Sequence, residues 1–194
     1  MYRITWTIKA SKLCNLRCRY CYEWDELRNP ARISLPDWAK IFRAIKRHNE
    51  LQAARLGVKV QTQIVWHGGE PLLLPTDYMR GVLALQENIL RREALNDGTY
   101  VNAIQSNLYR LTDDKLALVK EHNFQVGVSM DLAGGVRLAA GGQRTEARVA
   151  ENMDRLARAG VPYGAIVGSA GHTAKHRRII YDVLEELKIS FREP

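Results

Sequence analysis

Short β-rich runs alternate with longer helical runs along the whole chain, and this alternation restricts the possible folds more than any other feature. Six runs rich in strand-forming residues are separated by five segments with helical spacing. The order β(αβ)5 predicts one α/β domain with a parallel sheet, either doubly wound or curled into a barrel. The expected strands are Arg3 to Lys9, Thr62 to Trp66, Tyr100 to Gln105, Gln125 to Met130, Tyr163 to Val167 and Ile189 to Phe191.

The helical segments begin and end at recognisable signals. Ser34 followed by Asp37 is a capping-box pattern, and Gly57 follows the end of that helix. The second helix is expected to run to Leu95, and the fourth to end before Gly160. The expected caps of the four later helices are Thr76, Thr112, Thr145 and Thr173. In both parallel architectures ligands bind at the carboxyl ends of strands, so functional residues are expected there.

The composition is that of a soluble globular chain. Of 194 residues, 46% are hydrophobic and 26% are charged, which is enough for one domain with a substantial core. No apolar run approaches the roughly 20 residues of a membrane span, and the N-terminus lacks a signal peptide, so we expect a cytoplasmic protein with no membrane partner. The net charge of +8 fits an acidic partner, but the basic residues are dispersed, and no nucleic-acid partner is expected.

All cysteines of the chain lie directly after the first expected strand, as Cys14, Cys18 and Cys21 in the spacing CxxxCxxC. An odd number of cysteines without an export signal argues against disulfides. Three thiolates on one loop can bind three irons of a four-iron cluster and leave the fourth iron open for a reaction. The alternatives are a zinc site completed by a histidine such as His67, or three buried thiols without a metal.

The segment CNLRCRYC resembles the cluster loop of the radical S-adenosylmethionine (radical SAM) enzymes, which follows the first strand of a partial (βα)6 parallel barrel. The resemblance implies that fold, a [4Fe-4S] cluster held by Cys14, Cys18 and Cys21, and SAM as the second cofactor. In the family the open iron binds SAM, and the reduced cluster cleaves it to a 5′-deoxyadenosyl radical that abstracts a substrate hydrogen. The cofactors perform the difficult step, and the protein positions them.

A second motif, WHGGEPLL, follows the second expected strand. Gly68 and Gly69 let backbone groups approach a ligand without a Cβ clash, and Glu70 can receive an ammonium group. The motif resembles the segment that binds the SAM amino group, especially in the branch with anaerobic sulfatase-maturating enzymes and peptide maturases. That branch implies a peptide or protein substrate and an electron donor such as flavodoxin or ferredoxin.

Weaker resemblances assign further SAM-binding positions. Gln105-Ser106-Asn107 is similar to the QSNG segment of the same branch, although Leu108 stands where glycine is usual. Val128-Ser129-Met130-Asp131 is similar to SxDG, which places the Ser129 hydroxyl near the SAM carboxylate or ribose and leaves Asp131 as a possible polar anchor. The other expected cofactor-binding residues are Tyr20 and Val167 near the adenine, and Arg137 at the carboxylate with Arg144 as its rival.

Residues 1–194 are expected to form a single radical SAM core domain. No cysteine follows Cys21, so this sequence does not encode the cysteine-rich C-terminal domain that holds auxiliary clusters in many relatives. The chain is then either part of a longer maturase or a short enzyme whose sixth strand is covered by substrate, a partner or a dimer mate.

The sequence therefore predicts an oxidoreductase-type radical SAM enzyme that abstracts hydrogen from a peptide or protein side chain in post-translational modification, such as peptide natural-product maturation. A glycyl-radical-activating enzyme and a non-catalytic metal-binding scaffold that recognises peptides are the alternatives. Cleavage of SAM separates the enzymes from the scaffold.

Overall fold

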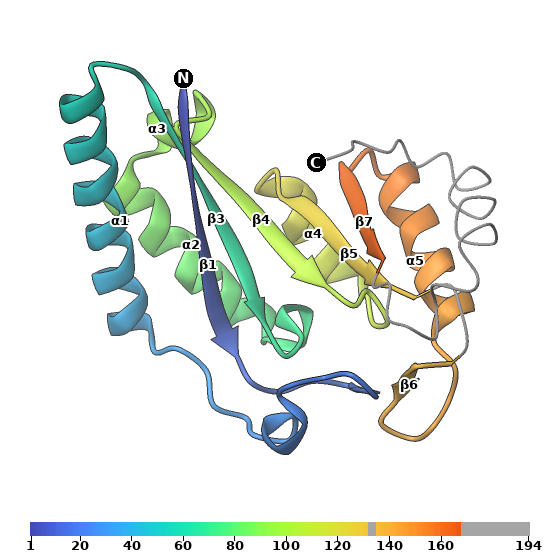
Figure 1. The fold of residues 1–194 in the computed structure, drawn as a ribbon. Coiled ribbons are helices and arrows are strands. Elements are labelled where there is room, and N and C mark those ends of the chain that lie inside the picture. The colour runs from blue at the N-terminus through green and yellow to red at the C-terminus, as the bar shows by residue number, and fades with distance from the viewer. Residues whose placement is uncertain (132–134, 168–194) are drawn as a thin grey trace.

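The computed structural model describes residues 1–131 and 135–167. In the described part of the chain, five parallel strands form the main sheet and lie side by side in chain order. A doubly wound sheet reverses its strand order, whereas an unreversed order with helices on one face curls toward a barrel. The described fold is therefore a partial barrel that is not closed, as predicted (Figure 1). The strands are β1 (Tyr2–Ser11), β3 (Val60–Gly68), β4 (Tyr100–Ser106), β5 (Gln125–Met130) and β7 (Tyr163–Val167).

The predicted strands differ from the observed ones only at their ends. β5 and β7 have the predicted bounds, β4 continues to Ser106, and β1 and β3 extend by a few residues in both directions. The extensions are real ladder pairs, because Tyr2 pairs with Val60 and Ser11 with Gly68. The expected strand at 189–191 and the expected cap Thr173 lie outside the described residues.

The first helix has the predicted caps. Ser34 Oγ accepts a hydrogen bond from the Asp37 backbone N–H at 3.2 Å and donates to Asp37 Oδ2 at 2.7 Å. Gly57 adopts a left-handed φ of 63° directly after the helix, where a residue with a Cβ would be strained. The helices of the described chain are α1 (Leu35–Leu56), α2 (Thr76–Leu90), α3 (Arg92–Asn96), α4 (Asp113–Glu121) and α5 (Glu146–Arg158).

The prediction of one continuous second helix to Leu95 is wrong. Arg91 has a φ of 73°, which ends α2 and starts the short helix α3. Thr76 does not cap α2 either: it is the first helical residue, Pro75 precedes it, and its hydroxyl donates to Asp114. Tertiary hydrogen bonding thus replaces the local cap that the sequence pattern predicts.

The predicted caps of the next two helices are correct in position and wrong in their bonding. Thr112 and Thr145 occupy the positions before α4 and α5, but neither side chain makes a capping hydrogen bond. Thr145 Oγ1 instead donates to the Arg137 carbonyl at 2.9 Å. This bond ties the start of α5 to the segment that follows β5.

The core lies between the sheet and its helices and fixes the position of β3 relative to α1. Trp38 of α1 stacks on Trp66 of β3 with ring centroids 4.9 Å apart, and Trp66 meets Phe124 edge-on at 5.8 Å. All three rings are completely buried. Aromatic pairs of this kind add about 0.5–1.5 kcal/mol each beyond their buried area. They hold the carboxyl end of β3 at a fixed place relative to α1.

A small antiparallel ribbon lies beyond the carboxyl ends of the sheet strands (Figure 1). It pairs β2 (Leu16–Cys18) with β6 (Arg137–Ala139), and the 3-10 turns η1 (Trp24–Glu26) and η2 (Pro71–Leu73) flank the same region. Three-residue strands have no readable periodicity, so the sequence does not predict this ribbon. No helix in the described part of the chain is long and apolar enough to cross a membrane.

Candidate cofactor-binding site

The carboxyl ends of β3, β4 and β5 and the cysteine loop enclose a cavity of about 260 Å³. All three cysteines line it, as the sequence predicts for ligands of one centre. Glu70 and Arg144 do not line it. Val167 ends β7 with its Cα paired to Met130, and its side chain lies outside the described part of the structure. The predicted cofactor-binding residues that do line it are Tyr20, Gly68, Gly69, Ser106, Ser129 and Arg137.

The three thiols are free and differ in their surroundings. Cys18 is buried, while Cys14 and Cys21 are half-buried. The sulfur of Cys14 accepts a hydrogen bond from the Leu16 N–H at 3.4 Å and from Asn107 Nδ2 at 3.7 Å. Hydrogen bonds to the cysteine sulfurs are among the features that set the reduction potential of an iron–sulfur cluster.

The protein alone keeps two of these thiols protonated. Burial raises the pKa of Cys14 to about 11, although the Leu16 N–H opposes the shift. Burial also raises the pKa of Cys18, and the guanidinium of Arg137 acts in the opposite direction. Only the thiolate binds a metal, so metal binding by Cys14 and Cys18 must overcome the effect of burial.

The zinc alternative requires ligands that converge on a single ion. Within residues 1–131 and 135–167, no three His, Cys, Asp or Glu side chains converge closely enough to hold one ion. A tetrahedral zinc site needs such convergence, whereas each thiolate of a four-iron cluster binds a different iron. His67, the histidine proposed to complete a zinc site, accepts the Gly68 N–H on Nδ1 at 2.7 Å.

The two glycines of the WHGGEP motif let β3 approach the cysteine loop. A Cβ on Gly68 would lie 2.1 Å from the Ser11 carbonyl oxygen, and one on Gly69 would lie 2.3 Å from that of Lys12. The Gly69 N–H donates to the Ser11 carbonyl at 3.0 Å. The glycines were expected to let a ligand approach. In the structure they also let the backbone of the cysteine loop approach β3.

Glu70 binds the end of β4 rather than facing the cavity. Its Oε1 accepts hydrogen bonds from the Leu72 N–H at 2.9 Å and Ser106 Oγ at 2.8 Å, and its Oε2 accepts the Asn107 N–H at 2.7 Å. Burial raises the pKa of this carboxyl, and the three hydrogen bonds oppose the shift. Contact between Glu70 and a ligand ammonium stays a prediction; in the described structure Glu70 is a positioning residue.

The end of β4 explains why glycine is usual at the position of Leu108. Leu108 has a left-handed φ of 52°, a conformation that costs an L-residue about 1–2 kcal/mol. Its side chain is nevertheless buried in the core, and its N–H donates to Ser106 Oγ at 2.9 Å. On the neighbouring strand Ser129 Oγ accepts from Gln105 Nε2 at 2.6 Å. The two predicted serines therefore lie at the cavity in fixed orientations.

Arg137 lies in the cavity wall, and Arg144 does not. Arg137 Nη1 donates to the Tyr20 hydroxyl at 3.2 Å, and that hydroxyl donates in turn to the buried Asp131. Burial and the hydrogen bond to Asp131 both raise the pKa of Tyr20. Arg144 is 73% exposed and pairs with Glu146 at 3.9 Å. Of the two arginines proposed for the SAM carboxylate, the structure places Arg137 beside the cysteines.

Sequence reasoning gave no role to Asn107, which connects three parts of the site. Besides reaching the Cys14 sulfur, its Nδ2 donates to Asn15 Oδ1 at 2.9 Å, and its N–H binds Glu70. Gln105 also lines the cavity. Both residues lie at the carboxyl end of β4, so the general rule for parallel sheets could have found them.

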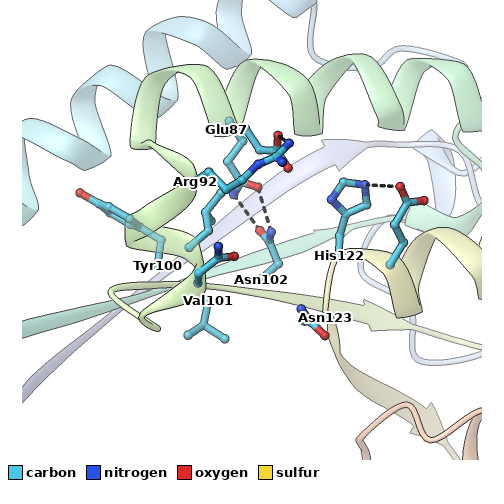
Figure 2. A pocket seen from close by; sticks show the side chains of 11 residues that line it. Glu87, Arg92, Tyr100, Val101, Asn102, His122 and Asn123 are labelled. Atoms are coloured by element: carbon cyan, nitrogen blue, oxygen red, sulfur yellow. Dashed lines mark hydrogen bonds and ion pairs between the residues drawn. The ribbon is translucent and has the colours of Figure 1, made fainter.

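A larger cavity of about 790 Å³ lies at the opposite, amino end of β4 (Figure 2). Its polar groups bind one another: Gln86 and Asn102 exchange two hydrogen bonds of 2.8 Å, and Arg92 pairs with Glu87 at 2.7 Å. No cysteine lines it. Parallel α/β folds place their ligands at the other end of the sheet, so the cysteine cavity is the candidate site.

The chain belongs to the radical SAM superfamily, whose family pattern matches residues 8–184. This membership confirms the resemblance drawn from the cysteine loop and the WHGGEP motif. The family's cofactors are a [4Fe-4S] cluster and SAM, and three thiols that line one cavity are a donor set that fits the cluster.

Relatives narrow the branch. The chain is 32% identical over 178 residues to the serine-type anaerobic sulfatase-maturating enzyme of Klebsiella aerogenes, covering 90% of this chain and 42% of that enzyme. The fold of the present chain matches that of native anSMEcpe with bound AdoMet and Cp18Cys peptide at a TM-score of 0.79 and 19% identity. The match covers 98% of this chain and 50% of that chain. Streptococcus suis SuiB bound to precursor peptide SuiA matches at 0.57, with 19% identity over 97% of this chain and 38% of that chain. The chain thus spans half or less of the length of these relatives.

Proposed function

We propose that this chain is the cofactor-binding core of a radical SAM enzyme that modifies a peptide or protein side chain after translation. The observation that carries the proposal is the gathering of Cys14, Cys18 and Cys21 in one cavity with Arg137. The peptide or protein substrate is supported by the similarity to sulfatase-maturating enzymes and by the peptides bound in anSMEcpe and SuiB.

Each group at the cavity has a distinct task in this proposal. The three cysteines hold the cluster, and SAM lies against a set of residues from the strand ends. When bound and reduced by one electron, the cluster and SAM would together supply the radical chemistry that removes a substrate hydrogen. The proposed SAM-binding set is Tyr20, Gly68, Gly69, Glu70, Ser106, Ser129, Arg137 and Val167, and Glu70 also orients the end of β4.

Arg137 is suited to a carboxylate because a guanidinium can donate two parallel hydrogen bonds to it. The Tyr20 hydroxyl accepts from Arg137 and donates to Asp131, so the guanidinium is held in place before a ligand arrives. The Ser129 hydroxyl accepts from Gln105, which leaves its own proton available for a ligand oxygen.

The finer parts of the proposal concern partners and location. The reaction consumes an electron, which a flavodoxin or ferredoxin would deliver, and such donors are cytoplasmic. The edge strand that follows β7 in a six-stranded barrel would be covered by substrate, a second copy or a partner chain. The residues of that strand lie outside the described ranges.

Anaerobic reconstitution with iron and sulfide, followed by electron paramagnetic resonance with and without SAM, tests the proposal. We expect a reduced four-iron signal that changes when SAM is added, and release of 5′-deoxyadenosine under reducing conditions. A tightly bound zinc, or a cluster that does not respond to SAM and releases no 5′-deoxyadenosine, would support the scaffold alternative and overturn the proposed activity. Cys18→Ala is the control that must lose both signals.

A further inference from the structure

The wall between the cysteines and solvent is thin on one side of the cavity. Tyr22 lines the cavity, yet it is 85% exposed, and it directly follows Cys21. The loop between β2 and α1, to which it belongs, lies beyond the carboxyl ends of the strands (Figure 1). A partner that contacts this loop would come within one residue of a cluster ligand.

This wall presents an unusual concentration of exposed aromatic side chains. Tyr20 is 48% exposed, Tyr22 85% and Trp24 50%, and the three lie within five residues of one another. Isolated exposed apolar residues are ordinary, but a group of exposed aromatic rings marks interaction surfaces. Tyr20 already binds Asp131 and Arg137, which leaves Tyr22 and Trp24 as the rings available to a partner.

The same stretch of chain carries net positive charge, even with the exposed Asp25 counted. Residues 9–32 contain six basic and three acidic residues. Two of the acidic residues are already used, because Lys9 pairs with Glu23, and Lys12 pairs with Glu26 at 2.8 Å. Arg19 and Arg28 are exposed, and neither has a carboxylate within ion-pair distance in the described part of the chain. Arginine with tyrosine and tryptophan is the residue combination most enriched at the centres of protein interfaces.

We propose that Arg19, Tyr22, Trp24 and Arg28, here called the loop face, form the docking surface for a small acidic one-electron donor protein. The inference rests on the proposed function, which requires one electron per SAM cleaved. The donor is oxidised by one electron and the cluster is reduced by one electron, with no bond made between the proteins. Complementary charge speeds encounters and makes them salt-dependent, and transient redox interfaces are small.

Reduced flavodoxin serves as the acidic donor in the test, and dithionite serves as a small reductant that needs no docking surface. The test variant R19E/R28E reverses two charges on the loop face. The matched control R43E/R47E makes the same change in net charge at two exposed arginines of α1. A second variant, Y22A/W24A, removes the rings without changing charge. Binding of oxidised flavodoxin to each reconstituted protein is measured by titration, independently of activity.

We expect R19E/R28E to lower both flavodoxin affinity and flavodoxin-driven SAM cleavage at least tenfold, and Y22A/W24A to lower the affinity severalfold. The control should change both less than twofold, and dithionite-driven cleavage should be equal in wild type, R19E/R28E and R43E/R47E. Because Tyr22 lines the cavity, Y22A/W24A is judged by its flavodoxin affinity alone. Wild-type binding should weaken as salt rises. Equal flavodoxin affinity in R19E/R28E and wild type would overturn the docking surface while leaving the proposed function intact.

Other outcomes separate the two proposals. If wild type binds flavodoxin through the loop face but cleaves no SAM with dithionite, the proposed function fails and the docking surface stands. If R19E/R28E loses dithionite-driven cleavage as well, the arginines support the cluster itself, and the docking surface is overturned. Self-association of wild type that disappears in R19E/R28E, with flavodoxin binding unchanged, would assign the loop face to a second copy of the chain.

Discussion

Of the two cavities at the ends of β4, the larger one contains polar groups that bind one another, and the smaller one contains the reactive side chains. The amino-end cavity is about 790 Å³, and its amides and ion pairs bind one another. The carboxyl-end cavity is about 260 Å³, but it gathers three free thiols and a guanidinium. Perturbed, incompletely paired groups mark a functional site more reliably than volume does. The comparison predicts that substitutions at the small cavity affect chemistry, whereas those at the large one affect only stability.

The largest expected effect is at the cysteines. Cys18→Ala leaves two thiolates for the cluster, so iron content and SAM cleavage should both fall to background. Asn96→Ala, which changes the lining of the amino-end cavity, should leave both at the wild-type level. Iron and sulfide analysis with an assay of 5′-deoxyadenosine measures the difference. SAM cleavage that survives in Cys18→Ala would contradict the proposal that the cysteine loop holds the cluster.

Gly69→Ala should be the next most damaging change. The new Cβ would lie 2.3 Å from the Lys12 carbonyl oxygen and 2.4 Å from that of Leu13, and backbone neighbours cannot rotate away. Overpacking of this kind costs about 1–3 kcal/mol in the free energy of unfolding, and here it also displaces the cysteine loop. Gly164→Ala, whose Cβ would have no atom within 4 Å, is the control. Equal unfolding midpoints and iron contents for the two variants would refute this account of the motif.

Glu70→Gln tests whether the buried carboxylate positions the end of β4. The amide keeps the shape, but its NH2 group would face a donor, which costs about 1–3 kcal/mol and should weaken SAM binding. Glu121→Gln at the amino-end cavity removes an exposed pair with Arg80 and should cost less than about 1 kcal/mol. Denaturant unfolding and SAM titration of the reconstituted proteins give both quantities. An unchanged SAM affinity in Glu70→Gln would confine Glu70 to a stabilising role.

Asn102→Ala should lower stability without changing chemistry. It leaves the buried amide of Gln86 without its partner, at a cost of about 1–3 kcal/mol in the free energy of unfolding. Replacing both residues by leucine should recover much of this loss. SAM cleavage per intact cluster should match wild type in both variants. A lower rate per cluster would break the distinction between the two cavities.

The smallest expected effect is a pH dependence remote from both cavities. Hydrogen bonds from Thr112 and Thr76 lower the pKa of Asp114 to about 2. Because the folded pKa is depressed, the stabilisation is fully present above about pH 4 and is lost as the pH falls toward the folded value. Asp114→Asn should therefore lower the melting temperature slightly near neutral pH and less in acid. Asp154 is an exposed residue of α5, and the effect of Asp154→Asn on the melting temperature should not change with pH in this way.

Sequence patterns predicted the parts of the fold that depend on long periodic segments. All five described sheet strands were found, because each is a run of five or more residues rich in strand-forming side chains between recognisable helical segments. The capping signals at Ser34 and Gly57 also held, since both act within a few residues of chain. The cysteines and the motif at Gly68 and Gly69 were predicted to share one site for a topological reason: parallel strands end at one edge.

The errors arose where distant contacts decide the local structure. No glycine or proline marks the break at Arg91, and the hydroxyl of Thr76 turns to Asp114 on another helix. Two of the three partners of Glu70 come from the end of β4, about 36 residues later in the chain, so its internal role could not be read from its own motif. Leu108 accepts an unfavourable backbone conformation because the core buries its side chain.

The ribbon of β2 and β6 links the two halves of the cofactor site mechanically. Cys18 and Arg137 are directly opposite each other in its ladder, and Thr145 fastens the Arg137 carbonyl to the start of α5. A bound molecule that shifts the backbone of Arg137 therefore also shifts the backbone of Cys18. Binding of a carboxylate at Arg137 and the position of Cys18 are therefore coupled through a ladder of only three residue pairs.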